Sequence, residues 1–185
     1  MGRTALIVVD MLNTYEHEDA DALIGSVREV VPNIASLIDR AKSQDADVVY
    51  VNDNYGTWDI GPKDLVEHAL AGAHRELVEP IVPPDDVTAF VLKARHSIFY
   101  QTPLEYLLRQ TLGVERLVLT GQVTEQCILY SALDAYIRHF EVMVPPDAVA
   151  TIHPELQEAA LQMMRINMKA DLTPTEDLRL SYEMT

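Results

Sequence analysis

Three side chains of reactive types follow the ends of three predicted strands. Asp10 directly follows one apolar run, Lys93 directly follows a second, and Cys127 lies shortly beyond a third. A thiol that is near an ammonium group and at the start of a helix is favoured as the thiolate. A carboxylate beside it can take up and return the proton. Together the three residues are candidates for nucleophilic catalysis.

Each of these residues also has an ordinary structural interpretation. An Asp after a strand is often a turn or cap residue, and a Lys there is usually a solvated charge. A lone Cys on an apolar helix face is often an inert packing residue. Only their combination at one edge of a sheet indicates chemistry.

Short, continuous apolar runs recur along the chain and predict strands that are buried on both faces. Five are clear, at 5–9, 48–51, 89–92, 117–119 and 142–144, and a weaker sixth lies at 168–172. Runs that do not alternate with polar residues are typical of a parallel sheet covered by helices. The irregular stretch 52–63 follows the second strand, at the sheet edge where ligands bind in such folds.

Segments with helical spacing lie between the strands. Pro32 suits the first turn of a helix that includes 34–41, and Thr102 suits the N-cap of another. Further helices are expected over 124–138 and from Pro154 onward. Because strands and helices alternate, we expect one α/β domain over 1–185, with three layers (α/β/α) and a mainly parallel, six-stranded sheet.

Composition narrows the possible partners and compartments. The 185 residues carry a formal net charge of −15, which argues against binding to nucleic acid or anionic membranes, although acidity also serves solubility alone. The chain has one cysteine and therefore no internal disulfide. Without a signal-like N-terminus or a long apolar run, it is expected to be cytoplasmic.

Three motifs resemble the isochorismatase-like cysteine hydrolases, the group that includes nicotinamidases and N-carbamoylsarcosine amidases. They read VVDMLN at 8–13, KARHSIFYQTPL at 93–104 and TGQVTEQC at 120–127. Their order and spacing match the family, and the resemblance covers nearly the whole chain. It implies the isochorismatase-like hydrolase fold.

The resemblance also implies roles for individual residues. Cys127 would be the nucleophile, Asp10 the proton acceptor and donor, and Lys93 the charge that holds both in their ionised forms. A cis, non-proline peptide bond would join Gln122 to Val123, and the N–H groups of Val123 and Cys127 would form an oxyanion hole. The expected reaction is hydrolysis of a small amide or ureido compound through a thioester, by a homo-oligomer.

Two departures from the relatives bear on metal binding and substrate choice. Nicotinamidases carry an Asp-x-His metal motif after the second strand, where this chain reads Asn52-Asp53-Asn54. Because His68 and His74 also lack the usual ligand spacing, we expect no metal and no cofactor. The histidines, His96 included, are interpreted as solvated or capping residues. The segment after Asp10 also differs from the family, which leaves the substrate open.

Several side chains leave the same sheet edge and could bind the substrate. The expected set is Tyr15, Asn54, Tyr55, Trp58 and Tyr100. Trp58 would line the mouth of the site or a subunit boundary. Two other functions stay open: hydrolysis of a vinyl ether, as in isochorismatases, and a catalytically degenerate binding or assembly module.

Overall fold

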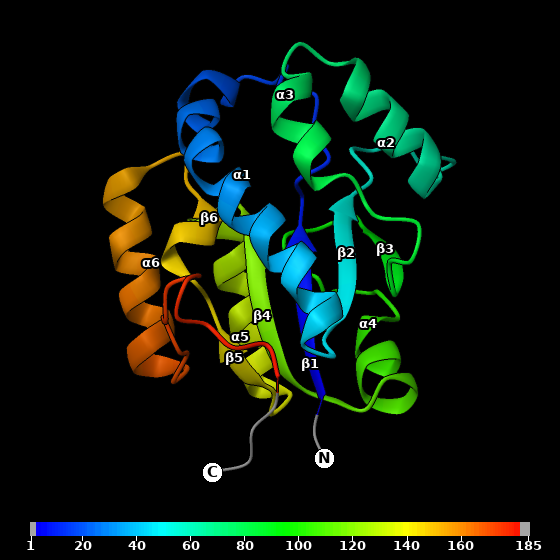
Figure 1. The fold of residues 1–185 in the computed structure, drawn as a ribbon. Coiled ribbons are helices and arrows are strands. Elements are labelled where there is room, and N and C mark those ends of the chain that lie inside the picture. Colours follow the sequence, from blue (N-terminus) through cyan, green and yellow to red (C-terminus); the bar gives the residue numbers. More distant parts are fainter. Residues whose placement is uncertain (1–2, 182–185) are drawn as a thin grey trace.

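A parallel sheet of six strands forms the centre of the molecule (Figure 1). The structure, a computed structural model, describes residues 3–181, except for the side chain of Lys42. The strands are β1 (Arg3–Val9), β2 (Asp47–Asp53), β3 (Ala89–Lys93), β4 (Val114–Gln122), β5 (Glu141–Met143) and β6 (Val149–Ala150). Their order is β3-β2-β1-β4-β5, and β6 pairs with the end of β4. All these pairings are parallel, so the carboxyl ends of the strands meet at one edge.

Helices cover both faces of this sheet. They are α1 (Ala20–Ser43), α2 (Pro62–Ala71), α3 (Arg75–Val78), α4 (Leu104–Tyr106), α5 (Leu129–Ile137) and α6 (Pro154–Asn167). Two π-helical segments, Leu107–Thr111 and Thr124–Ile128, and two 3-10 turns, Glu79–Ile81 and Pro146–Ala148, complete the elements. Leu6 and Val8 pack toward α1, α2 and α3, whereas Ile7 and Val9 pack toward α4, α5 and α6. This alternation gives two apolar layers and confirms the three-layer α/β/α prediction.

The sixth strand is not where the sequence predicted it. Strand β6 is Val149–Ala150, whereas in the expected run 168–172 only Asp171 forms a bridge, with Met143. The apolar character of that run has another cause, because Met168 and Ala170 are buried against the core beyond the end of α6. A strand of two residues is too short to produce a recognisable apolar run.

Two predicted helix starts also differ from the structure. Helix α1 begins at Ala20, so Pro32 lies inside it rather than in its first turn. Leu23 and Val27 extend the buried stripe toward the N-terminus, and this burial outweighs the helical hydrogen bond that an interior proline removes. Thr102 accepts the N–H of Leu104, but α4 begins one residue later than expected.

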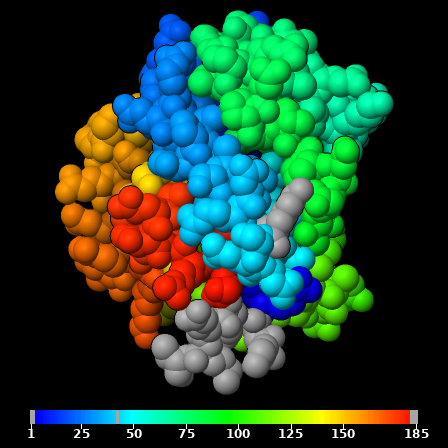
Figure 2. All heavy atoms as spheres, viewed as in Figure 1, coloured from blue at the N-terminus to red at the C-terminus, as the bar shows by residue number. Residues whose placement is uncertain are grey.

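The last described residues of the chain are hydrogen-bonded to the C-terminal end of α1. Arg40 donates to the carbonyl of Thr175 at 2.7 Å, and the N–H of Leu180 donates to Gln44 at 2.7 Å. Figure 2 shows this C-terminal segment, in red, lying against the end of α1. Within residues 3–181, none of the helices is both long and apolar enough to span a membrane.

Candidate active site

The carboxyl edge of the sheet brings the three candidate residues together. Asp10 follows β1 directly, Lys93 is the last residue of β3, and Cys127 lies in the π-helical segment that follows β4. Gly121 makes the close approach of β1 and β4 possible, since its φ is +109° and a Cβ there would lie 2.1 Å from the carbonyl oxygen of Val9. Asp10 also has a left-handed backbone, with φ of 56°. Strained backbone of this kind is frequent at functional sites.

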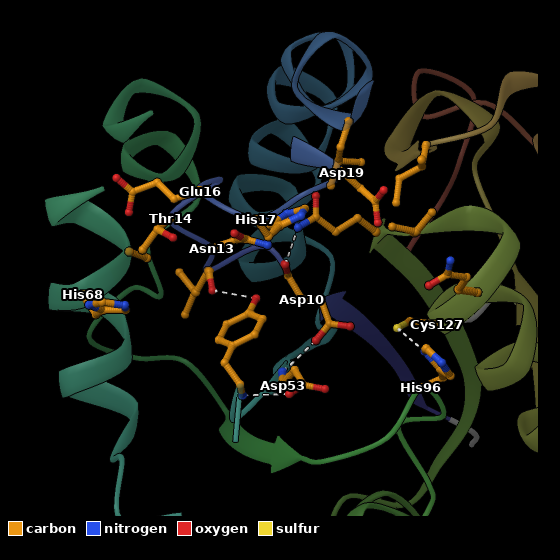
Figure 3. Close-up of a pocket in the computed structure, with 18 residues that line it drawn as sticks. Asp10, Asn13, Thr14, Glu16, His17, Asp19, Asp53, His68, His96 and Cys127 are labelled. Atoms are coloured by element: carbon orange, nitrogen blue, oxygen red, sulfur yellow. Dashed lines mark hydrogen bonds between the residues drawn. The ribbon is translucent and has the colours of Figure 1, made fainter. Parts of the chain in front are cut away.

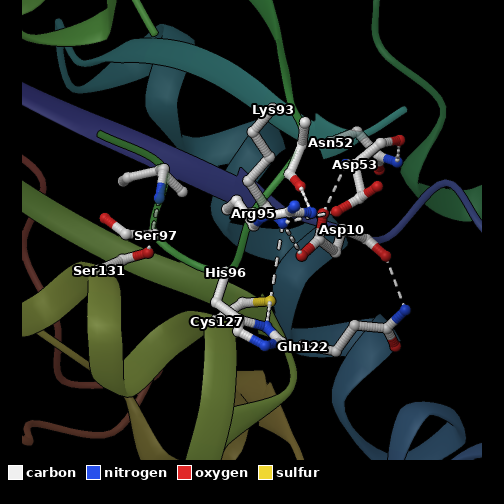
Figure 4. Close-up of polar contacts among 12 residues, drawn as sticks. Asp10, Asn52, Asp53, Lys93, Arg95, His96, Ser97, Gln122, Cys127 and Ser131 are labelled. Atoms are coloured by element: carbon white, nitrogen blue, oxygen red, sulfur yellow. Dashed lines mark hydrogen bonds and ion pairs between the residues drawn. The ribbon is translucent and has the colours of Figure 1, made fainter. Parts of the chain in front are cut away.

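Lys93 contacts both other members of the cluster (Figure 4). Its Nζ lies 2.8 Å from Asp10 Oδ2 and 3.7 Å from Cys127 Sγ. Asp53, which the sequence did not single out, is a further partner of this ammonium group at 3.5 Å. The N–H of Asp53 donates to the other carboxylate oxygen of Asp10 at 2.7 Å. The cluster is thus one connected network that ends at the sulfur.

Burial and charge set the protonation of this network at rest. Burial raises the pKa of Asp10, and Lys93 opposes that effect. Burial lowers the pKa of Lys93, but the negative charge of Asp10 and its hydrogen bond with Lys93 oppose that effect, and the pKa is raised. Burial and then the charge of Asp10 raise the pKa of Cys127 to about 12, although Lys93 lowers it.

The expectation of an ionised thiol is therefore wrong for the resting protein. Lys93 is largely neutralised by Asp10, so its charge does not compensate for the loss of solvent around Cys127, which is 9% exposed. Cys127 rests as a thiol that is hydrogen-bonded to Asp10. The arrangement suits transfer of a proton from sulfur to carboxylate during attack.

The backbone between β4 and Cys127 points a donor at the sulfur. The peptide bond between Gln122 and Val123 is cis. The N–H of Val123 hydrogen-bonds to Cys127 and lowers the pKa of its thiol. Gln122 donates to the carbonyl of Asp10 at 2.6 Å and accepts from the hydroxyl of Tyr15 at 3.5 Å. These contacts tie the loops after β1 and β4 together.

Glu125 anchors the segment that carries Cys127. It is 8% exposed, and its carboxylate accepts the N–H groups of Ile152 at 3.0 Å and His153 at 2.9 Å. The hydroxyl of Thr151 donates to the same carboxylate at 2.8 Å. The segment is thereby fixed to the chain between β6 and α6, so the position of the sulfur is set by two neighbouring elements.

A cavity of about 510 Å³ opens beside the sulfur (Figure 3). Figure 3 shows His68 and His96 on opposite sides of it, with Asp10 between them. Its charged and titratable lining residues are Asp10, Glu16, Asp19, Asp53, His17, His68, His96, Tyr55 and Cys127. None of the described lining residues is Lys or Arg. A neutral or cationic group therefore meets less electrostatic repulsion there than an anion.

The expected substrate-binding residues are spread over more than one hollow. Tyr55 lines the cavity beside Cys127, as does Val123 of the expected oxyanion hole. Asn54 and Trp58 line a neighbouring hollow of about 490 Å³, which shares Asp53, Tyr55 and His96 with that cavity. Tyr100 shares a smaller hollow with Trp58. Tyr15 is 3% exposed, packs in the core instead of lining the cavity, and donates its hydroxyl to Gln122.

The residues at the position of the nicotinamidase metal motif do not fit a metal ion. Asn52 accepts the N–H of Leu12 at 2.9 Å and donates to its carbonyl at 3.2 Å, so its amide is engaged in holding the loop. Asn54 accepts the N–H of Gly56 at 3.0 Å. In the part of the chain that the structure describes, no group of three or more His, Cys, Asp or Glu side chains could hold a metal ion.

Sequence reasoning overlooked His96 as a neighbour of the sulfur. Its Nδ1 lies 3.7 Å from Cys127 Sγ, and its ring is exposed, so it is solvated as expected but not isolated. One signal was available in the sequence. His96 follows Lys93 by three residues, in the loop that leaves the same sheet edge.

Comparisons with known proteins agree with the class that the fold and cysteine site define, a hydrolase with a three-layer α/β/α fold and a buried thiol. The isochorismatase domain model matches residues 4–177, and the chain belongs to this family.

Individual relatives differ in their described activity. The chain is 33% identical over 174 residues to the uncharacterized isochorismatase family protein YaaI of Bacillus subtilis, covering 94% of this chain and 95% of that one. It is 31% identical to a probable inactive nicotinamidase of Arabidopsis thaliana, covering 93% and 92%. The crystal structure of N-carbamoylsarcosine amidase from Thermoplasma acidophilum superposes with a TM-score of 0.72 at 25% identity, covering 95% and 98%.

Proposed function

We propose that this isochorismatase-family protein is a cysteine hydrolase that cleaves the C–N bond of a small amide or ureido compound. The observation that carries the proposal is the buried network in which Lys93 contacts Asp10 at 2.8 Å and Cys127 at 3.7 Å, beside an open cavity. Nucleophile, proton acceptor and fixed positive charge thus lie within reach of one another, as acyl transfer requires.

The first half of the reaction follows from this geometry. Asp10 takes the proton of the Cys127 thiol as the sulfur attacks the substrate carbonyl. The N–H groups of Val123 and Cys127 stabilise the oxyanion that forms. The C–N bond then breaks, the departing nitrogen takes the proton from Asp10, and ammonia or an amine leaves. The acyl group stays on the sulfur as a thioester, which water hydrolyses.

Two observations bear on the alternative functions. The relative described as probably inactive keeps the degenerate module open as the second candidate. The carboxylate-rich lining of the cavity argues against the vinyl-ether alternative, because isochorismate is a dicarboxylate and the lining offers no Lys or Arg among its described residues. A neutral amide or ureido group meets no such repulsion.

An ammonia-release screen over small carboxamides and carbamoyl compounds tests the proposal. The expected result is turnover of at least one neutral compound by the protein and none by Cys127→Ala. Release of pyruvate from isochorismate, measured in parallel, would replace this proposal with the vinyl-ether hydrolase. Binding of a compound without turnover by either protein would support the degenerate module instead.

A further inference from the structure

The imidazole of His96 borders the sulfur of Cys127 on the side of the open cavity. Its Nδ1 lies 3.7 Å from Cys127 Sγ, and the residue lines both the cavity beside the thiol and the neighbouring hollow. Figure 4 shows the ring next to the sulfur, with Lys93 reaching the sulfur from another direction. An acyl group on the sulfur therefore lies within reach of the ring, either directly or through one water molecule.

Contacts with α5 hold this ring in place. The ring of His96 packs against that of Tyr130, with centroids 5.6 Å apart and an angle of 53° between the planes. The next two residues are tied to the same region, since Ser97 donates its hydroxyl to Asp134 and the N–H of Ile98 donates to Ser131 at 3.1 Å. His96 is thus a positioned side chain despite its exposure to solvent.

Asp10 is less well placed to activate a water molecule. Its Oδ2 is bound by Lys93 at 2.8 Å and its Oδ1 by the N–H of Asp53 at 2.7 Å. Only 10% of its side chain is exposed, and Lys93 keeps it in the ionic network. These contacts suit exchange of a proton with the adjacent thiol. Water reaches the exposed ring of His96 more readily, and imidazole is well suited to proton transfer near neutral pH.

We propose that His96 is a catalytic residue of the second half-reaction, in which the thioester is hydrolysed. The inference rests on the proposed function, because it requires an acyl group on Cys127. His96 takes a proton from water as the water oxygen bonds to the acyl carbon. The bond between carbon and sulfur then breaks, the sulfur leaves as a thiolate beside Lys93, and His96 returns the proton to it. The products are the free carboxylic acid and the thiol, so no other reactant is needed.

Acetylation with p-nitrophenyl acetate separates the two halves of the reaction. This ester needs no acid to expel its leaving group, so formation of acetyl-Cys127 does not depend on His96. Intact-protein mass spectrometry follows formation and decay of the acetyl group in the wild type, His96→Gln and His139→Gln. His139 is exposed beyond the end of α5, outside the lining of the cavity, and serves as the matched control.

The expected result is selective loss of hydrolysis. Acetylation of His96→Gln stays within about threefold of the wild type, whereas decay of its acetyl group slows about 100-fold, the scale of one general base. Hydroxylamine, which attacks without a base, restores the decay, and His139→Gln behaves as the wild type. A merely structural role would not give this rescue.

Three results would overturn the inference. Decay unchanged in His96→Gln would mean that another group activates the water. Equal slowing of both steps, without rescue by hydroxylamine, would make His96 a positioning residue for Cys127. Absence of acetyl-Cys127 in the wild type would remove the nucleophile itself, and with it the proposed function, which the other two results leave intact.

Discussion

Lys93 and Asp10 form a buried ion pair, with Nζ and Oδ2 2.8 Å apart and no solvent exposure of the lysine side chain. Removal of one partner of such a pair leaves an uncompensated buried charge, which typically costs about 3–5 kcal/mol. Burial raises the pKa of Cys127, and because the two charges of the pair oppose each other there, the sulfur stays protonated at rest. The carboxylate of Asp10 can then accept the proton of the thiol, which would not be possible if the sulfur were already a thiolate.

This opposition predicts that Asp10→Asn makes Cys127 more reactive toward iodoacetamide while it abolishes turnover. The charge of Asp10 raises the pKa of the thiol and that of Lys93 lowers it, so neutralising Asp10 lowers the pKa from about 12. The thiolate fraction at pH 8 then increases, and alkylation speeds up about tenfold or more, since one pKa unit changes that fraction tenfold. Rates measured by mass spectrometry are unambiguous because the chain has one cysteine.

The control for this experiment is Glu16→Gln, which neutralises a carboxylate that lines the cavity but is not among the groups that shift the pKa of Cys127. Its alkylation rate should stay within about twofold of the wild type. Slower alkylation of Asp10→Asn would show that Asp10 does not hold the thiol in its protonated form.

Exhaustive chelation is expected to leave turnover unchanged. Asn52 and Asn54 occupy the place of the nicotinamidase metal motif, and both side-chain amides are engaged with the backbone. Activity is compared before and after dialysis against EDTA and 1,10-phenanthroline, with metal content followed by mass spectrometry. Loss of activity that zinc, iron or manganese restores would contradict the expectation.

The cavity should discriminate between reagents of different charge. Iodoacetamide and iodoacetate are nearly equal in size, but only iodoacetate is an anion. The ratio of the iodoacetamide rate to the iodoacetate rate at Cys127 should exceed the same ratio for the unfolded chain by about tenfold, equivalent to about 1.4 kcal/mol. The reason is that Asp10, Glu16, Asp19 and Asp53 line the cavity, whereas none of its described lining residues is Lys or Arg. Glu16→Gln combined with Asp19→Asn should lower the ratio, whereas Glu29→Gln, outside the lining, should not. Equal ratios in folded and unfolded protein would exclude charge selection by the cavity.

Gly121→Ala is expected to destabilise the fold severely. A Cβ at this position would lie 2.1 Å from the carbonyl oxygen of Val9, and φ of +109° disfavours any side chain. We expect a loss of about 3 kcal/mol or more in the free energy of unfolding, measured with urea. Gly25→Ala is the matched control, since nothing lies within 4 Å of its Cβ and alanine favours a helix by up to about 1 kcal/mol. A stable Gly121→Ala protein would mean that β1 and β4 can separate at little cost.

Local patterns were sufficient to predict five of the six strands and the place of the catalytic candidates. Continuous apolar runs marked the five main strands, and parallel strands must end at one edge, which brings Asp10 and Lys93 together. The family motifs added the roles of Asp10, Lys93 and Cys127 and the cis peptide bond, which no periodicity reveals. The start of α1 was missed because Pro32 suggested a boundary that burial of Leu23 and Val27 overrides.

The electrostatics of the site could not be predicted from the sequence. The pKa of Cys127 depends on how much solvent it loses and on whether Asp10 already neutralises Lys93, and both are set by packing between distant segments. His96 was overlooked for a related reason. An exposed histidine looks the same in a sequence whether or not a cysteine far along the chain lies beside it.

Trp58 is the expected site residue for which a place at the mouth of the site and a place at a subunit boundary are both open. It is 82% exposed and lines the hollow next to the cavity that holds Cys127. Trp58 does not line that cavity itself, although Asp53, Tyr55 and His96 line both. Contact with another molecule would remove the apolar surface of this indole from water and thereby stabilise the complex. We therefore expect Trp58 to contribute to assembly of the homo-oligomer that the family resemblance implies more than to catalysis.

Trp58→Ala tests this assignment by light scattering and acetylation kinetics together. The dissociation constant of the oligomer should rise at least about tenfold, as for loss of an aromatic anchor worth 1.4 kcal/mol or more. The rate of acetylation of Cys127 by p-nitrophenyl acetate should change less than about threefold, since the residue does not line that cavity. Tyr106→Ala, which removes another aromatic side chain that is 70% exposed, is the control and should leave both quantities unchanged. An unchanged mass combined with a tenfold slower reaction would instead place Trp58 at the mouth of the site, where the sequence first suggested it.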